Sequence, residues 1–137
     1  MQNLLYWSPF LGNVGTVKST LNSALAFKKF SRNKYNVKII NVFGEWNNYK
    51  NILKKSDIEL INLSFNYINF LPKNGFIKSR ISYTLIFLIS FLPLLKLLKK
   101  ENNSIFIAHL ITSLPLLINF IFKINSKIIL RISGYPK

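Results

Sequence analysis

The segment LLYWSPFLGNVGT, residues 4–16, predicts a strand followed by a glycine turn. Its first four residues form an apolar run typical of a buried strand. Pro9 ends that strand, because proline lacks the N–H that a central strand must donate. Gly12 and Gly15 are both free to adopt positive φ, so the chain can turn sharply between them.

A helix is expected to begin directly after this turn. Thr16 is expected to be its N-cap, because a threonine hydroxyl can accept a hydrogen bond from an N–H group of the first turn. Apolar residues then recur at the spacing of one helix face, at Val17, Leu21, Ala24 and Leu25. The N-terminus of such a helix directs unpaired N–H groups toward the glycines, and anions bind well there. The alternative is that the glycines only make a tight turn, without a ligand.

The glycine spacing does not complete any of the familiar phosphate-binding motifs. A dinucleotide fingerprint requires G-x-G-x-x-G, but Val14 occupies its second glycine position. A P-loop requires glycine before its Lys-Ser pair, but Val17 precedes Lys18. A GxxG loop also clamps RNA backbone in KH domains, although this one follows a strand near the N-terminus. The turn therefore suits an anion, but its sequence identifies no ligand.

The composition describes a basic, apolar chain with the length of one domain. Its 137 residues are 50% apolar and 15% aromatic, which suits a packed core and not a disordered chain. The formal net charge of +15 comes from 19 Lys and Arg against 4 Asp and Glu, and it predicts an anionic partner. Because the lysines are scattered among apolar residues, we expect a membrane surface rather than nucleic acid.

Residue counts exclude several kinds of chemistry. The chain has no cysteine, which excludes disulfides and thiolate catalysis. One histidine and four carboxylates are too few to predict a metal site. The N-terminus lacks the basic start and long apolar core of a signal peptide, so we expect a cytoplasmic location.

Strand-like and helix-like stretches alternate along the rest of the chain. β-branched and apolar runs predict strands, and stretches with helical spacing predict the helices between them. The later strands are expected at residues 37–43, 59–63, 105–108 and 127–132, and the later helices at 48–55, at 81–95 and from about Pro115. This rhythm predicts the α/β class, as a Rossmann-like parallel sheet with helices on both faces.

Two uncharged runs must be compared in length with a membrane-spanning helix. Residues 81–95 number fifteen, whereas a span needs about 20. We therefore expect a long crossover helix, either buried on the sheet or lying against a membrane. Residues 105–122 number eighteen, but their first four are strand-like and Pro115 suits the first turn of a helix. This second run predicts a strand, a turn and a helix.

Two more segments contain candidate contacts. Glu45 follows the expected second strand, at the edge where α/β sheets present their ligands. We expect its carboxylate either to bind a sugar hydroxyl or to be solvated. Residues 65–78 mix aromatic and aliphatic side chains with cations, as segments that touch an anionic bilayer do. An ordinary loop that lies on its own domain is the alternative.

Three short motifs resemble the N-terminal domain of glycosyltransferases with the GT-B fold, in particular the family 4 type. They are Tyr6-Trp7-Ser8-Pro9 with Gly12-Asn13-Val14-Gly15, Ala108-His109 with Thr112-Ser113-Leu114-Pro115, and Arg131-Ile132-Ser133-Gly134-Tyr135-Pro136-Lys137. In that family two Rossmann-like domains face one another. The first mostly holds the acceptor and the second holds the nucleotide-sugar. The resemblance implies sugar transfer with retained anomeric configuration, usually without a required metal.

The same resemblance implies roles for individual residues. His109 would be the catalytic residue that contacts the transferred sugar or the acceptor, and a packed histidine is the alternative. Backbone N–H groups at Gly12 and Gly15 would approach the donor diphosphate. Arg131 would contact phosphate or acceptor, unless it points into solvent. The full set implied for donor phosphate or acceptor binding is Gly12, Asn13, Gly15, Thr16, Thr112, Arg131 and Ser133.

The resemblance covers residues 1–137 and implies one N-terminal domain, which we expect to be truncated relative to the family and to lack the C-terminal nucleotide-sugar domain. We expect such a fragment to be inactive alone, because both domains supply groups to the transition state. The expected partners are a nucleotide-sugar as co-substrate, with no other cofactor, and a polysaccharide, lipopolysaccharide or lipid-linked acceptor at the inner face of a membrane. A small basic nucleic-acid-binding α/β module and a short integral membrane protein remain the alternatives.

Overall fold

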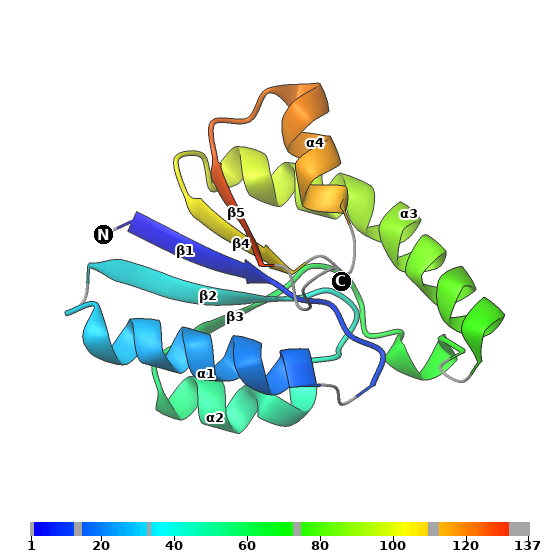
Figure 1. Ribbon diagram of the computed structural model, residues 1–137, viewed down its shortest axis with the longest axis horizontal. Helices are drawn as coiled ribbons and strands as arrows, with labels where there is room; N and C mark the ends of the chain where they lie inside the picture. Colours follow the sequence, from blue (N-terminus) through cyan, green and yellow to red (C-terminus); the bar gives the residue numbers. More distant parts are fainter. Residues whose placement is uncertain (1, 13–14, 33, 73–74, 110–112, 132–137) are drawn as a thin grey trace, which may run out of the picture.

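The computed structural model of the chain (Figure 1) describes residues 2–12, 15–32, 34–72, 75–109 and 113–131. Its centre is a five-stranded sheet in which every strand pair is parallel, with the order β3-β2-β1-β4-β5. The strands are β1 (Gln2–Trp7), β2 (Tyr35–Asn41), β3 (Glu59–Asn62), β4 (Ile105–His109) and β5 (Lys127–Arg131). The predicted α/β class and the parallel sheet are confirmed.

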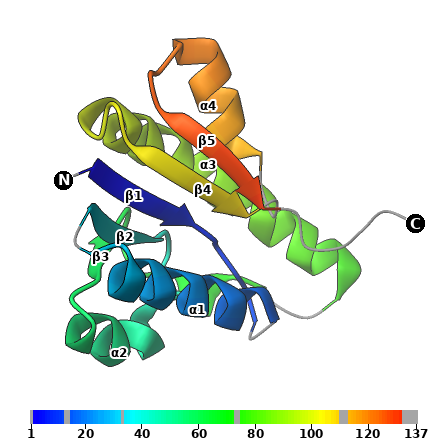
Figure 2. The same cartoon turned by 60° about the vertical axis from the view of Figure 1, so that its left-hand side comes forward.

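Helices cover both faces of this sheet. Figures 1 and 2 show α1 and α2 on one face and α3 and α4 on the other. The helices are α1 (Gly15–Phe30), α2 (Lys50–Lys55), α3 (Phe76–Lys100) and α4 (Leu114–Phe122), with short 3₁₀ turns η1 (Asn47–Tyr49) and η2 (Ile68–Phe70). This is a Rossmann-like arrangement, as the strand and helix rhythm predicted.

The core has two halves, one on each side of the sheet. Side chains alternate along β1, so that Leu4 and Tyr6 join the half under α1 whereas Leu5 and Trp7 join the half under α3 and α4. All four are at most 1% exposed. A central parallel strand is covered on both faces, which explains why this segment reads as an unbroken apolar run.

The second strand ends earlier than predicted, at Asn41 instead of Phe43. The N–H groups of Val42 and Phe43 donate to the carboxylate of Glu45, so they do not continue the ladder. Gly44 has a φ of +101° and an added Cβ would lie 2.3 Å from Asn66 Oδ1. The turn after β2 therefore requires glycine, a need that the sequence pattern did not reveal.

Helix α3 is longer than the uncharged run that predicted it. Its sheet-facing side chains recur every four residues and include the buried Ile86, Leu94 and Leu98. Among the described residues, α3 alone is a helix long and apolar enough to cross a membrane, with a mean hydropathy of 2.0 over a window that is 28% buried. The second uncharged run divides into β4 and α4, as predicted.

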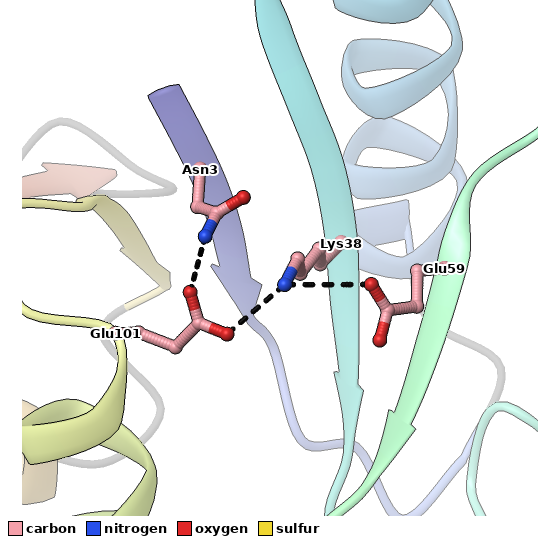
Figure 3. A network of polar contacts seen from close by, with 4 residues as sticks. All are labelled: Asn3, Lys38, Glu59 and Glu101. Atoms are coloured by element: carbon pink, nitrogen blue, oxygen red, sulfur yellow. Dashed lines mark hydrogen bonds and ion pairs between the residues drawn. The ribbon is translucent and has the colours of Figure 1, made fainter. Parts of the chain in front are cut away.

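An ion-pair network fixes the C-terminal end of α3 to the amino end of the sheet (Figure 3). Lys38 on β2 donates to Glu101 at 2.9 Å and lies 3.4 Å from Glu59 on β3. The side-chain amide of Asn3 on β1 donates to the same Glu101 carboxylate. Burial alone would lower the pKa of Lys38, but the two carboxylates outweigh it and the pKa is raised.

Candidate functional site

The carboxyl ends of β1 and β4 lie side by side at the point where the strand order reverses. Trp7 pairs with Ala108, so Ser8 follows β1 next to the position where His109 ends β4. His109 in turn pairs with Arg131 at the end of β5. In open α/β sheets, ligands bind outside the carboxyl ends of the strands at this kind of reversal. The sheet thus brings His109 and Arg131 to the edge where the sequence predicted them.

His109 is buried and bonded to α1. Its Nε2 lies 2.8 Å from Thr20 Oγ1, and the Thr20 hydroxyl donates to Ser8 Oγ at 3.2 Å. In a neutral imidazole one ring nitrogen donates a hydrogen bond and the other accepts one. The other ring nitrogen, Nδ1, has no hydrogen-bond partner among the described residues. Burial, with the nearby Arg131 charge, lowers the pKa of His109, so the neutral ring is favoured.

Arg131 also reaches α1, and its guanidinium does not point into solvent. One of its nitrogens donates to Ser19 Oγ and another to the Ser19 carbonyl oxygen at 3.4 Å. Tyr6 on β1 makes a third hydrogen bond to α1, since its hydroxyl lies 2.9 Å from Ser23 Oγ. The ends of three strands are therefore bonded to one side of α1. We call Ser8, Ser19, Thr20, His109 and Arg131 the strand-end cluster.

The sequence pattern missed the α1 members of the strand-end cluster. Apolar spacing marked Val17, Leu21 and Ala24 as the buried side of α1, and all three are buried. Thr20 is buried with them but is polar, so a search for apolar residues at helical spacing does not select it. Its position three residues after Val17, on the same side of the helix, was the available signal.

The glycine turn differs from its prediction in two ways. Helix α1 begins at Gly15, so Thr16 is the second helical residue and not the N-cap. Its hydroxyl oxygen is buried and has no hydrogen-bond partner among the described residues. Gly12 does not adopt positive φ, and an added Cβ at Gly12 or Gly15 would meet no described residue within 4 Å beyond its chain neighbours. The part of the chain that the structure describes therefore leaves open space at both glycines.

Three of the predicted site residues, Asn13, Thr112 and Ser133, lie outside the described residues. Their predicted roles therefore stay predictions.

Glu45 is buried, which contradicts the expectation of a solvated carboxylate, whereas its contact with a sugar stays a prediction. Only 3% of the residue is exposed, and its two carboxylate oxygens accept the N–H groups of Val42 (3.0 Å) and Phe43 (2.8 Å). Burial raises the pKa of Glu45 to about 7, against the lowering effect of these backbone hydrogen bonds. Glu45 therefore stabilises the turn that ends β2.

Two grooves on the surface lie away from the strand-end cluster. A groove of about 440 Å³ runs between β3 and α3, and another of about 390 Å³ lies between α2 and the amino end of β3. Neither is lined by a member of the cluster. Within the described ranges, no group of three or more histidine or carboxylate side chains could hold a metal ion.

Comparisons with protein-family models, with curated proteins and with solved structures found no match to this chain. Its own geometry therefore carries the functional argument.

Proposed function

We propose that this chain is the acceptor-side domain of a retaining glycosyltransferase of the GT-B, family 4 type. It would act on a nucleotide-sugar and a polysaccharide, lipopolysaccharide or lipid-linked acceptor of the cell envelope. The observation that supports this most is the position of the strand-end cluster and the α1 N-terminus, together at the reversal of strand order between β1 and β4. Ligands of open α/β sheets bind at this position.

The start of α1 has the features that an anionic group such as a diphosphate needs. The first N–H groups of a 16-residue helix are free of intrahelical partners and carry the positive end of its dipole. The open space at Gly12 and Gly15 allows an anion to approach the backbone closely. Arg131, bonded to Ser19 in the second turn of α1, adds a positive charge on the same side. We assign this place to the donor diphosphate.

His109 is the residue we assign to the sugar or acceptor hydroxyl. Its Nδ1 has no hydrogen-bond partner among the described residues, which is rare for a buried polar atom. A sugar hydroxyl suits this nitrogen in either tautomer of the ring, because a hydroxyl can both donate and accept a hydrogen bond. Because the residue is only 2% exposed, a sugar could reach Nδ1 only after the residues that cover the ring move.

Sugar transfer itself would need a second domain that presents the nucleotide-sugar, as the GT-B resemblance implies. The largest gains in such reactions come from groups held on both sides of the reacting bond. The 137-residue chain alone should therefore bind diphosphate weakly and transfer no sugar.

The test is a titration of the ¹⁵N-labelled chain with UDP-glucose, GDP-mannose and inorganic pyrophosphate, followed by amide NMR. We expect shifts at residues 15–20 and at His109, with dissociation constants in the millimolar range. Gly15→Val fills the open space and should abolish the shifts. Asn22→Val is the matched control, because Asn22 is exposed on the same helix beyond its first turn. No response to any of the three ligands would contradict the proposal. Salt-dependent shifts with an oligonucleotide alone would favour the nucleic-acid module.

A further inference from the structure

Helix α3 has an exposed apolar side along most of its length. Ile77, Ile81, Leu85, Leu88 and Leu92 recur at intervals of three and four residues, so they share one side of the helix. This side points away from the sheet, and Ile77, Leu88 and Leu92 are 71%, 64% and 64% exposed. Side chains that pack on the sheet lie on the other side of α3.

Helix α4 extends this apolar surface. Phe120 is 86% exposed and Ile121 is 54% exposed, and Leu117 lies on the same outer side. The two helices cover the same face of the sheet (Figure 2). They also touch, because the rings of Phe91 and Phe122 lie 6.3 Å apart. Their outer sides therefore adjoin. We define the α3–α4 face as Ile77, Ile81, Leu85, Leu88, Leu92, Leu117, Phe120 and Ile121.

Charges around the α3–α4 face are of one sign. Exposed lysines lie at both ends of α3 and directly after α4, and they are Lys78, Lys96, Lys99, Lys100 and Lys123. After Glu59 the sequence has one more acidic residue, Glu101. That carboxylate is buried and paired with Lys38, so it does not offset the exposed lysines. The face is apolar at its centre and cationic at its margins.

These charges indicate which class of partner the α3–α4 face can bind. A second copy of the chain would bring two sets of lysines together without a carboxylate between them, which is repulsive. A nucleic acid would pair with the lysines but would leave the apolar side chains in water. An anionic phospholipid bilayer satisfies both, since aliphatic and aromatic side chains enter the interface and lysines pair with headgroups.

The structure also favours a helix that lies on the bilayer over one that crosses it. One side of α3 is part of the core, through Ile86, Leu94 and Leu98. A crossing helix would lose these contacts and the Lys38–Glu101 ion pair. The groove between β3 and α3 is lined in part by Leu92, Lys96 and Lys100, so a lipid headgroup beside the inserted side chains would meet two cations.

We propose that the α3–α4 face docks flat onto an anionic phospholipid bilayer, as a peripheral contact at the inner face of a membrane. The apolar side chains of the face enter the interface and the surrounding lysines bind acidic headgroups. This inference does not rest on sugar transfer, so either proposal can fail without the other.

The first test is co-sedimentation of the chain with vesicles at 150 mM NaCl. We expect binding to vesicles of phosphatidylcholine with 30% phosphatidylglycerol, and at least tenfold weaker binding to phosphatidylcholine alone. Leu88→Gln/Leu92→Gln/Phe120→Gln should weaken binding at least tenfold. Phe27→Gln/Phe30→Gln/Ile52→Gln is the matched control, because it removes three exposed apolar side chains from α1 and α2 and should bind like the parent chain. All these positions are exposed, so thermal unfolding should change little.

A second test uses the absence of cysteine from the chain. A single cysteine at Leu88 or at the exposed Lys54 can then be labelled with an environment-sensitive fluorophore. We expect a blue shift with anionic vesicles for Leu88→Cys and none for Lys54→Cys. Equal binding by the α3–α4 face variant and its control, equal binding to both vesicle types, or resistance to carbonate extraction would each overturn the proposal. The proposal would also be overturned if the parent chain formed a dimer and bound no vesicles, and if the α3–α4 face variant were a monomer.

Discussion

Glu45 has a carboxyl group enclosed by the backbone of its own turn. Its pKa is about 7 in the folded chain, against an ordinary value of 4.5. The folded state therefore binds the proton more tightly than the unfolded state does, so Glu45 adds stability below pH 4.5 that is lost as the pH rises through 7. One pKa unit corresponds to about 1.4 kcal/mol, so the loss should be about 3 kcal/mol.

Urea denaturation between pH 4 and 8 checks this prediction, with Glu45→Gln as the variant. The free energy of unfolding of the parent chain should fall across this range relative to that of Glu45→Gln. His109 has the opposite effect on the pH dependence of stability. Its pKa is lowered in the folded state, so the unfolded state binds more protons at pH values below the ordinary histidine pKa of 6.5. That contribution is common to both proteins and cancels in the difference. A constant difference at all pH values would contradict the prediction.

The residues that sequence reasoning placed well are those whose role depends on near neighbours. Pro115 lies in the first turn of α4, as its chemistry predicted. Glu45 was misjudged because its burial depends on how Gly44, Phe43 and Tyr67 close over the end of β2. Burial of a polar group depends on tertiary packing, which the spacing of residues along the chain does not reveal.

At the scale of the elements, a buried ion pair holds the C-terminal end of α3 against β2. Lys38 and Glu101 have side chains only 10% and 8% exposed, and their atoms are 2.9 Å apart. Removal of one partner leaves the other charge buried, which typically costs about 3–5 kcal/mol, whereas replacement of both by apolar groups is often neutral.

We therefore expect Lys38→Met to lower the free energy of unfolding by about 3 kcal/mol or more. The double variant Lys38→Met/Glu101→Leu should recover most of that loss. Lys28→Met is the control, since Lys28 pairs with Asp57, whose side chain is 91% exposed, and it should cost less than about 1 kcal/mol. Equilibrium urea denaturation measures all three. Equal losses for Lys38→Met and Lys28→Met would show that the ion pair does not hold α3.

At the scale of the whole molecule, charge is distributed unevenly. Three of the four acidic residues fall between Glu45 and Glu59, whereas the positive charge extends over the whole chain. A net charge of +15 keeps copies of the chain apart in dilute salt. Salt reduces the range of this repulsion, to about 4 Å at 0.5 M NaCl.

This leads to a prediction about self-association. In 0.5 M NaCl without lipid, the exposed apolar residues of the α3–α4 face should bring copies together, whereas in 0.05 M NaCl the chain should stay monomeric. The variant Leu88→Gln/Leu92→Gln/Phe120→Gln should stay monomeric in both. Analytical ultracentrifugation at matched protein concentration measures the oligomeric state. Association of this variant at high salt would locate the apolar contact elsewhere.

The sequence by itself determined the order of strands and helices, because each depends on the spacing of apolar residues and on turn residues close in the chain. It also determined the parallel sheet, since helix-length connections between strands favour parallel pairing. The α3–α4 face and the strand-end cluster were decided only by the tertiary structure. Thr20 meets His109 across 89 residues and Ser19 meets Arg131 across 112. Such contacts depend on how the strands pair side by side and on how α1 packs across their ends. The spacing of nearby residues in the sequence does not reveal either arrangement.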